Sequence, residues 1–590
     1  MTTDADPLDL RYRDSSLPIA ERVEILLGQM TVEEKAGLLF HTMITMGPDG
    51  TLSSGDASMG LPSTAEYISD RHITHFNLRG YAPTAREMAE WHNRLQRLAA
   101  STRLGIPVTI STDPRHSFAD NPGVAMSAGP FSLWPEPLGL AATRDPALVR
   151  EFADIARQEY LAVGIRVALH PQVDLATEPR WARALQTFGE DVELVSELGV
   201  AYVRGLQGES LGPGSVSAMV KHFPGGGPQK DGEDPHFPYG REQVYPGGEF
   251  DLHLEPFLRV FAAGASQVMP YYGMPIGTEH EEVGFGFNRS VLTGLLRERL
   301  GFAGIVCTDW GLITDRRMLG QSFPARAWGV EHLSPRERMR MILNAGADQF
   351  GGEHCTELLL DLVSSGDVPQ ERLDDSARRL LSEKFALGLF DDPYVDVDAA
   401  DGIVGSPRFR AAGEAAQRAS ITVLADDESV LPLAAGARLY VEGIDAATAT
   451  GYGEVVAAPE DADVAVLRIQ APYDERTTAF ENLFHAGSLE FSADTVEHIA
   501  RTARRVPTVV DVFLDRPALL EPVVDAASAV VANWGASAGA LLDVLFGRAP
   551  ASGRLPFDVP RSTAAVEASR PDVPFDTHRP LFRFGHRQEL

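Results

Sequence analysis

Several side chains with catalytic or ligand-binding potential directly follow short apolar runs in the first two thirds of the chain. Asp309 follows the run 304–308, and a carboxyl at the end of a buried strand is costly unless it is hydrogen bonded or functional. The adjacent Trp310 offers a flat apolar face on which a sugar ring can stack. Lys221 and His222 supply donors that suit a ligand crowded with hydroxyl groups. The residues with this placement are Asp113, Arg183, Lys221, His222, Asp309 and Trp310.

Each of these residues also has an ordinary structural explanation when it is considered alone. An aspartate after a strand often caps the next turn, and an arginine often serves a structural ion pair. Four different strand ends, however, would deliver polar groups to one face if the strands form a single barrel. Chance would place several such polar groups on one face much less often than it would place any one of them at a strand end. The pattern therefore predicts one polar site built from several strands.

The elements that must position these residues alternate along the chain. Short β-rich runs, most of them apolar without strict alternation, are separated by helical stretches such as 85–100, 146–163 and 190–206. Thr31 with Glu34, and Ser334 with Glu337, are capping boxes that should open two more helices. Alternation of this kind predicts a TIM-type (β/α)8 barrel, whose active site lies at the carboxyl ends of the strands.

Residues beyond the barrel predict a second unit. The segment from 390 to 407 is rich in Asp, Gly and Pro, and another alternating region with five apolar runs follows it. We predict a barrel domain over residues 1–392, a linker over 393–410 and an α/β sandwich domain over 411–590. The length of 590 residues agrees with more than one hydrophobic core.

Composition excludes several classes of function. The net charge of -31 makes nucleic acid an unfavourable partner. No apolar stretch approaches the roughly 20 residues of a membrane helix, so we expect no membrane partner. The N-terminus shows no basic segment followed by an apolar one, and we expect a cytoplasmic protein. Two cysteines are too few for a disulfide framework.

Several motifs in order resemble glycoside hydrolase family 3. They are Lys221-His222-Phe223 with its glycine-rich tail, Glu178-Pro179-Arg180-Trp181, Thr308-Asp309-Trp310, the segment 383–390, Gly553-Arg554-Leu555-Pro556-Phe557 and Phe582-Arg583-Phe584-Gly585-His586. The resemblance extends from about residue 20 to 587. It implies a barrel followed by an α/β sandwich, and an exo-acting retaining β-glycosidase that hydrolyses terminal non-reducing β-D-glucosyl or xylosyl residues through a covalent glycosyl-enzyme.

The resemblance also implies roles for individual residues. Asp309 matches the nucleophile of the family, and Tyr272 matches a tyrosine near the nucleophile. The residues that match the subsite for the terminal sugar are Asp113, Arg183, Lys221, His222 and Trp310. One departure concerns Asp113, which is followed by Pro114-Arg115-His116-Ser117 where the family usually has His-Gly shortly after the aspartate. This difference weakens the transfer of hydroxyl contacts near Asp113.

A retaining hydrolase also needs an acid/base group. The family usually takes a glutamate from a variable loop of the second domain, here residues 471–491. Glu481 lies closest to the expected spacing, and Glu475 is next. Arg476, beside Glu475, would favour the ionised form of that carboxyl, which is unfavourable for a proton donor. We therefore predict Glu481 as the acid/base and keep Glu475 as a candidate.

Two alternatives remain open. One branch of the family uses an Asp-His pair on a barrel loop and acts on N-acetylglucosaminides, and residues 230–236, which end in His236, resemble that loop. That branch often lacks a second domain, so a β-N-acetylglucosaminidase ranks second. The other alternative is a catalytically silent sugar-binding relative, for which the presence of Asp309 is unfavourable.

The expected partner of the protein is a small oligosaccharide or another β-glycoside. His72 and His75 form the only close histidine pair, which is weak evidence for a metal, and we assign neither a metal nor a cofactor. The sequence does not determine the oligomeric state, and it is compatible with a homo-oligomer.

Overall fold

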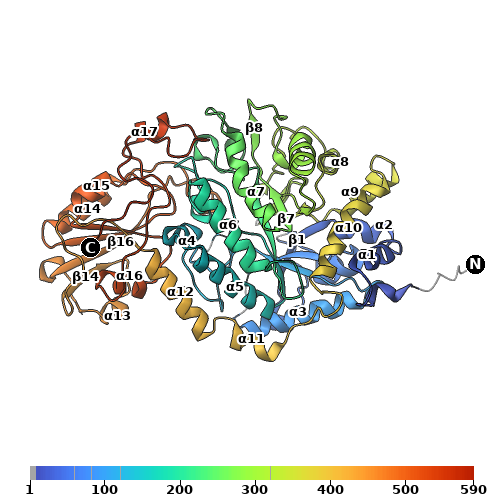
Figure 1. Cartoon of the computed structure of the whole chain (residues 1–590), viewed down its shortest axis with the longest axis horizontal. Helices are drawn as coiled ribbons and strands as arrows, with labels where there is room; N and C mark the ends of the chain where they lie inside the picture. The colour runs from blue at the N-terminus through green and yellow to red at the C-terminus, as the bar shows by residue number, and fades with distance from the viewer. Residues whose placement is uncertain are drawn as a thin grey trace, which may run out of the picture.

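The computed structural model describes residues 8–58, 60–80, 83–119, 121, 123–318 and 321–589. Figure 1 shows the first two thirds of the chain, coloured blue to yellow, gathered around one sheet. The last third, coloured orange to red, forms a second body at the end of the molecule opposite the N-terminus.

The first body contains a parallel sheet of eight strands, in the order β12-β1-β2-β3-β4-β5-β7-β9. An isolated parallel bridge between Cys307 and Gln349 joins the two ends of this order, so the sheet closes on itself. The predicted TIM-type barrel is thereby confirmed. The strands are β1 (Phe40–Thr45), β2 (His75–Arg79), β3 (Thr109–Thr112), β4 (Ile165–Ala168), β5 (Ser217–Phe223), β7 (Gln267–Pro270), β9 (Ile305–Val306) and β12 (Phe350–Gly351).

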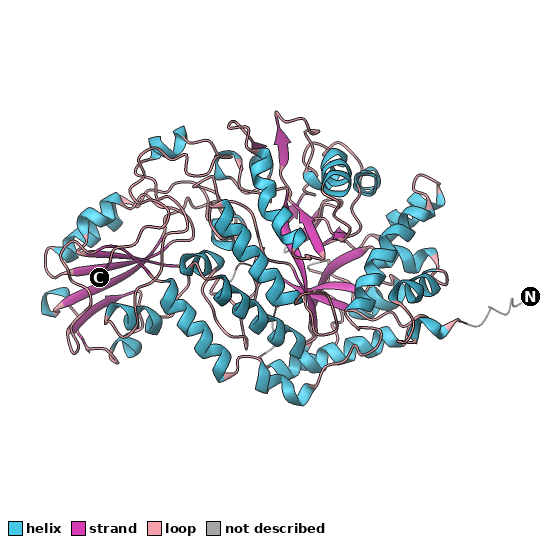
Figure 2. Cartoon of the chain, viewed as in Figure 1, coloured by secondary structure: helices cyan, strands magenta, loops and turns pink. Residues whose placement is uncertain are grey.

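Helices surround this sheet, as Figure 2 shows in cyan around the magenta strands. The connection from β1 to β2 differs, because the only helical segment longer than one turn among its described residues is a five-residue π-helix, η3 (Glu66–Asp70). In the described parts of the chain, no helix is both long and apolar enough to span a membrane. The main helices are α3 (Ala85–Ala100), α4 (Pro137–Thr143), α5 (Pro146–Ala162), α6 (Val192–Gln207), α7 (Glu255–Ala262), the π-helix η9 (Ser290–Arg299), α8 (Pro335–Ala345), α9 (Thr356–Ser364) and α10 (Gln370–Ala386).

The predicted helix starts are confirmed at both capping boxes. Thr31 opens α2 (Val32–Leu38), and its hydroxyl accepts from the Glu34 backbone N–H while the Glu34 carboxylate accepts from the Thr31 N–H. The same reciprocal bonds join Ser334 and Glu337 at the start of α8. Such pairs satisfy backbone donors that would otherwise lack a partner in the first turn.

The second body contains a six-stranded sheet in the order β13-β18-β17-β16-β14-β15. Only β13 runs antiparallel to its neighbour, and helices flank the sheet, so the predicted α/β sandwich is also confirmed. The strands are β13 (Thr422–Ala425), β14 (Arg438–Glu442), β15 (Glu454–Val455), β16 (Val464–Gln470), β17 (Thr508–Phe513) and β18 (Ala529–Asn533). The flanking helices are α12 (Pro407–Ser420), α13 (Ala446–Ala449), α14 (Ala493–Ala503), α15 (Glu521–Ala526) and α16 (Ala538–Leu545).

The segment predicted as a linker carries regular structure. It contains α11 (Val397–Ile403) and the first residues of α12. The Arg86 backbone N–H, on α3, donates to the Asp401 carboxylate at 2.9 Å, so α11 lies against the barrel. The domain boundaries themselves stay a prediction.

The two bodies share a hydrophobic core. Leu138, Ala142 and Leu185 of the barrel belong to the same buried cluster as Leu514 and Trp534, which directly follow β17 and β18 of the second body. At the edge of this contact the buried Glu190 carboxylate accepts the backbone N–H groups of Asp558 and Phe575. Because apolar surface of both bodies is removed from water here, the contact holds them in a defined orientation.

Candidate active site

A cavity of about 580 Å³ lies at the carboxyl ends of the barrel strands. It is lined by every residue that the sequence predicts for the nucleophile and the sugar subsite, namely Asp113, Arg183, Lys221, His222, Tyr272, Asp309 and Trp310. Its wall is completed by Phe480 and Leu483 from the loop that follows β16. The cavity therefore takes residues from both bodies.

Asp309 stands three positions beyond β9 and is 8% exposed. Its Oδ1 accepts the Trp310 backbone N–H at 2.8 Å, and its Oδ2 lies 4.0 Å from Nε2 of His222. The Tyr272 hydroxyl also accepts from the Trp310 N–H and donates to the Trp310 carbonyl, each at 3.0 Å. Burial, with the negative charge of Asp309, raises the pKa of Tyr272 well above its ordinary value, so the phenol stays protonated. A protonated phenol thus lies next to a carboxylate with one oxygen open to the cavity.

Asp113 lies in a cluster of cationic and amide groups at the ends of β2, β3 and β5. Lys221 Nζ and Arg79 Nη1 each lie 3.5 Å from its carboxylate, and the Asn77 amide donates to it at 3.0 Å. Burial disfavours the Asp113 carboxylate, but Lys221, Arg79 and Asn77 outweigh burial and lower its pKa. Burial lowers the pKa of Lys221 in turn. The group can bind several neighbouring hydroxyls as both donor and acceptor.

His222 is oriented by a residue that sequence reasoning did not single out. Asp174 is fully buried, and its Oδ2 lies 3.0 Å from Nδ1 of His222. The same carboxylate accepts the backbone N–H groups of His222 and Gly226. Burial lowers the pKa of His222 well below its ordinary value and raises the pKa of Asp174 to about 6. The imidazole is therefore neutral near pH 7, and Asp174 selects the tautomer with its proton on Nδ1.

Arg183 is buried, and its guanidinium is held by two glutamine side chains. Nη2 donates to Oε1 of Gln172 at 3.0 Å and Nε to Oε1 of Gln186 at 3.3 Å. Trp310 also lines the cavity, and its indole lies 5.4 Å from the His41 ring. The structure thus brings all seven residues of this prediction to one cavity.

Asn77, Arg79 and Asp174 are the neighbours of the site that sequence reasoning missed. Asn77 and Arg79 lie on β2, whose sequence His75-Phe76-Asn77-Leu78-Arg79 contains too many polar residues to read as an apolar strand. Strict alternation over these five residues was the available signal. Asp174 follows β4 by six residues, and no local pattern distinguishes it.

The predicted acid/base residues lie at the edge of this site. Glu481 opens the short 3-10 helix η11 (Glu481–Leu483), and Oε2 accepts from both the N–H and the hydroxyl of Thr478. Its Oε1 accepts the Tyr239 hydroxyl at 3.1 Å. Partial burial raises its pKa, but the bonds from Thr478 and Tyr239 outweigh burial and lower it. Glu475 is exposed, and neither glutamate is among the residues that line the cavity. Both roles stay predictions.

His236 of the alternative Asp-His pair lines the cavity directly. Its Nδ1 lies 2.6 Å from Oδ1 of Asp234, which is 1% exposed, and its ring packs edge-on against Tyr272 at 4.7 Å. Burial lowers the pKa of His236, whereas Asp234 acts in the opposite direction and does not fully offset it. Nε2 makes no hydrogen bond with any residue in the described ranges, which leaves it available to a ligand.

No cluster of three or more His, Cys, Asp or Glu side chains able to hold a metal is found among the described residues. His75, one of the two histidines that lie close together in the sequence, is buried within β2, and its neighbours are other barrel side chains such as His41.

The barrel and the second body each match a family model. Residues 55–383 match the glycosyl hydrolase family 3 N-terminal domain, and residues 439–589 match the corresponding C-terminal domain. The chain is 53% identical over 579 residues to a probable beta-glucosidase C of Aspergillus flavus, an alignment that covers 98% of this chain and 91% of that protein. It is 42% identical over 603 residues to a periplasmic beta-glucosidase/beta-xylosidase of Dickeya chrysanthemi, with 98% and 91% covered.

Solved structures share the fold. A crystal structure of beta-glucosidase from Listeria innocua in complex with isofagomine superposes with a TM-score of 0.75 at 22% identity, covering 96% of this chain and 82% of that one. The exo-1,3/1,4-beta-glucanase of a Pseudoalteromonas species gives 0.78 at 20% identity, with 97% and 73% covered. The two family matches, the length of the sequence similarity and the two-body architecture together show that this chain belongs to glycosyl hydrolase family 3.

Proposed function

We propose that this protein is a β-glucosidase that removes terminal non-reducing β-D-glucosyl residues with retention, through a covalent bond to Asp309. The observation that carries the proposal is the single cavity in which Asp309 lies beside Tyr272, His222 and the Asp113 cluster. The names of the relatives, which include beta-glucosidases and a beta-glucosidase/beta-xylosidase, support glucose as the terminal sugar and make xylose the next sugar to test.

The first chemical step needs an anionic carboxylate at the anomeric carbon. One Asp309 oxygen attacks that carbon as the bond to the leaving oxygen breaks, and the leaving oxygen takes up a proton. In the second step a water molecule, deprotonated by the group that gave up the proton, attacks the same carbon and releases Asp309. The phenol of Tyr272, whose proton is donated to the Trp310 carbonyl, stays uncharged beside Asp309 and adds no second negative charge on this side of the sugar.

We propose His236, backed by Asp234, as the group that donates and then accepts this proton. His236 lines the cavity, and its Nε2 makes no hydrogen bond with a described residue, whereas both oxygens of Glu481 are hydrogen bonded at the rim. Nε2 of the imidazolium would give its proton to the leaving oxygen, while Nδ1–H stays bonded to Asp234. Glu481 remains the competing assignment, and it comes from the second body.

The nucleophile is tested with nitrophenyl glycosides. Asp309→Ala should remove nearly all hydrolysis of 4-nitrophenyl β-D-glucoside, and Glu428→Ala, at an exposed position of the second body, should not. Thermal unfolding of both variants controls for the fold. Near wild-type turnover by folded Asp309→Ala would refute the assignment.

The proton donor is tested by rescue with azide. A variant without the acid/base should accumulate glycosyl-enzyme from an activated substrate, and azide should release that intermediate without base assistance. We expect rescue for His236→Ala and none for Glu481→Ala, Glu475→Ala or the exposed control His332→Ala. Rescue at Glu481→Ala alone would return the role to the second body.

The Asp234–His236 pair also gives the test a second substrate. The loop at residues 230–236 resembles that of a family branch that acts on N-acetylglucosaminides, so 4-nitrophenyl N-acetyl-β-D-glucosaminide belongs in the same panel. If the unaltered protein prefers that substrate to the β-glucoside, the N-acetylglucosaminidase alternative replaces the proposal.

A further inference from the structure

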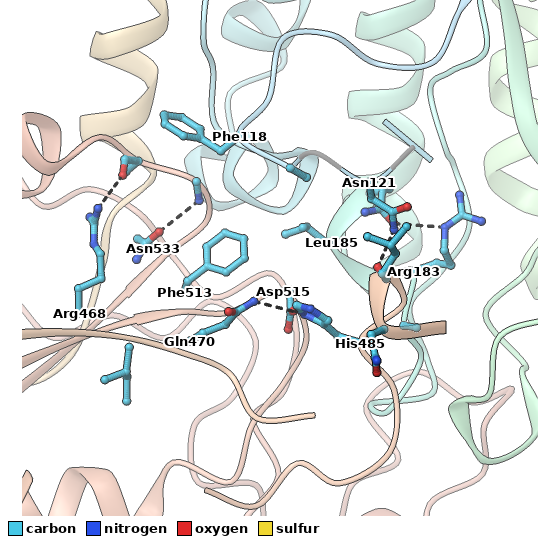
Figure 3. A pocket seen from close by; sticks show the side chains of 18 of the residues that line it. Phe118, Asn121, Arg183, Leu185, Arg468, Gln470, His485, Phe513, Asp515 and Asn533 are labelled. Carbon is cyan, nitrogen blue, oxygen red and sulfur yellow. Dashed lines mark hydrogen bonds and ion pairs between the residues drawn. The ribbon is translucent and has the colours of Figure 1, made fainter. Parts of the chain in front are cut away.

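A second cavity, of about 540 Å³, lies between the barrel and the second sheet. Figure 3 shows it between the barrel residues Phe118, Asn121 and Leu185 on one side and Arg468 of β16 and Phe513 of β17 on the other. Its volume is within the range of roughly 300–1,000 Å³ that is typical of small-molecule sites. None of the residues to which we assign a chemical step lines this cavity.

The position of this cavity in the second sheet is one at which open α/β sheets bind ligands. Gly443 follows β14, Gln470 ends β16, Phe513 ends β17 and Asn533 ends β18, and all four line the cavity. After β14 the chain forms β15 on one side and then β16 on the other, so the strand order reverses at β14. Crevices outside the carboxyl ends of strands at such a reversal are preferred ligand sites.

Cationic and anionic side chains balance in the cavity wall. Arg468 Nε donates to the Asp511 carboxylate at 2.6 Å, and His485 Nδ1 lies 2.5 Å from Oδ2 of Asp515. Arg183, held by two neutral glutamines, adds one positive charge to the wall, and Asp515 adds one negative charge, so the cavity favours an uncharged ligand. Asp515 is 7% exposed, and its Oδ1, like Nη2 of Arg468, is buried without a hydrogen-bond partner among the described residues. Unsatisfied polar atoms of this kind are costly, and hydroxyl groups of a ligand would satisfy them.

Aromatic rings are interspersed with these polar groups. Phe118 is 37% exposed although it is a large apolar side chain, and Phe513 lines the same cavity from β17. A pyranose presents apolar ring faces and a rim of hydroxyl groups, so it suits aromatic rings that alternate with unpaired polar atoms. We propose that this cavity is an accessory binding site for a neutral sugar, specifically a glucosyl unit.

This cavity shares two wall residues, Arg183 and Leu483, with the catalytic cavity. The sugar can therefore come from two sources. It is either the reducing-side part of a longer β-glucan whose terminal unit occupies the catalytic cavity, or a separate glucose molecule. The choice of a glucosyl unit rests on the proposed function, whereas the site itself rests on the cavity.

The test compares matched proteins by titration calorimetry. The parent is Asp309→Ala, which lacks the nucleophile, and the variant adds Phe513→Ala and Gln470→Ala. The control adds Tyr394→Ala and Gln370→Ala, two exposed positions outside both cavities. The ligands are glucose, cellobiose and cellotetraose. Rates of 4-nitrophenyl β-D-glucoside hydrolysis, measured with Asp309 restored, should change by less than about 2-fold in the variant, because that short substrate does not extend beyond the catalytic cavity.

The two sources give different losses. If the site holds the reducing side of the substrate, affinity for cellotetraose should fall about 10-fold or more in the variant while affinity for cellobiose is kept, on the scale of one or two lost hydrogen bonds with an aromatic contact. If the site holds separate glucose, the parent should bind a second equivalent of glucose that the variant loses. Unchanged cellotetraose affinity together with unchanged glucose stoichiometry would overturn the proposal. Failure of the proposed function would instead appear as no β-glucoside hydrolysis by the unaltered protein.

Discussion

Asp174→Asn is the most informative single substitution beside the proposed reaction centre. Asp174 does not line the catalytic cavity, so it acts through His222 as a positioning residue. Its carboxylate accepts three N–H groups, from His222 N, Gly226 N and Nδ1 of His222. An asparagine keeps the shape but has one oxygen acceptor and one NH₂ donor.

The expected loss follows from this change of donors and acceptors. If the new oxygen keeps the backbone N–H groups, the new NH₂ faces Nδ1 of His222, and the proton of the neutral imidazole must move to Nε2. A group that accepted a substrate hydroxyl then becomes a donor. One mismatched buried hydrogen bond costs about 1–3 kcal/mol, so kcat/KM for 4-nitrophenyl β-D-glucoside should fall roughly 10- to 100-fold.

The pH dependence separates positioning from general damage to the fold. Because the pKa of Asp174 is raised to about 6, the unaltered protein should lose activity as the pH falls through about 6 and this carboxylate is protonated. Asp174→Asn should lack that acidic limb. The assay is initial rates from about pH 4.5 to 8, a range that brackets this pKa, with ¹⁵N NMR of histidine to report the tautomer of His222.

The reasoning about Asp174 would be refuted by one combined result. In that result, Asp174→Asn keeps kcat/KM within about 2-fold, an energy change too small for a lost buried hydrogen bond. It also keeps the acidic limb and the Nδ1–H tautomer. A fall in activity that parallels a large fall in melting temperature would mean that Asp174 serves the fold alone.

Three further predictions concern the cavity and the contact between the two bodies. Lys221→Ala and Arg183→Ala should each lower kcat/KM by about 10²-fold or more, as expected for lost charged hydrogen bonds, and unchanged steady-state kinetics in both would contradict a shared sugar subsite. For an alkyl β-glucoside, kcat/KM should fall as the pH rises through the pKa of His236, because the proton donor must be protonated, and burial places this pKa below its ordinary value. The pH–rate profile of Glu481→Gln should show the same fall. Burial raises the pKa of Glu190 to about 8. The contribution of protonated Glu190 to stability is therefore complete below the ordinary glutamate pKa and is lost as the pH rises through about 8. The melting temperature of the unaltered protein should fall between these two pH values, and that of Glu190→Gln should fall less steeply.

Local patterns in the sequence were sufficient for most of the fold. The capping boxes at Thr31 and Ser334 and the apolar runs of β5 and β17 predict elements that the structure contains, because caps and apolar runs depend on neighbours in the chain. No apolar run in the sequence predicts the barrel strands β1, β2 and β12. β1 and β2 carry His41, His75 and Asn77, which are buried in the barrel although their residue types suggest exposure.

The segment predicted as a linker is a second place where local sequence did not predict the structure. Asp, Gly and Pro between residues 390 and 407 indicate loop, but α11 forms there with Asp396 as its N-cap and lies against α3. Short helices gain most of their stability from packing, which composition does not report. Tertiary contacts therefore decided the structure of this segment.

For the site, the sequence by itself determined which residues stand at strand ends, since parallel strands place their carboxyl ends at one face of a barrel. That rule brought Asp113, Lys221, His222 and Asp309 together without knowledge of any distance. Tertiary structure alone decided what faces the cavity. The loop after β16 presents Phe480 and Leu483 to it and turns Glu481 to Thr478 and Tyr239, while the loop after β5 presents His236. The physical reason is that the direction of a loop side chain depends on hydrogen bonds and packing with distant segments, which spacing along the chain does not encode.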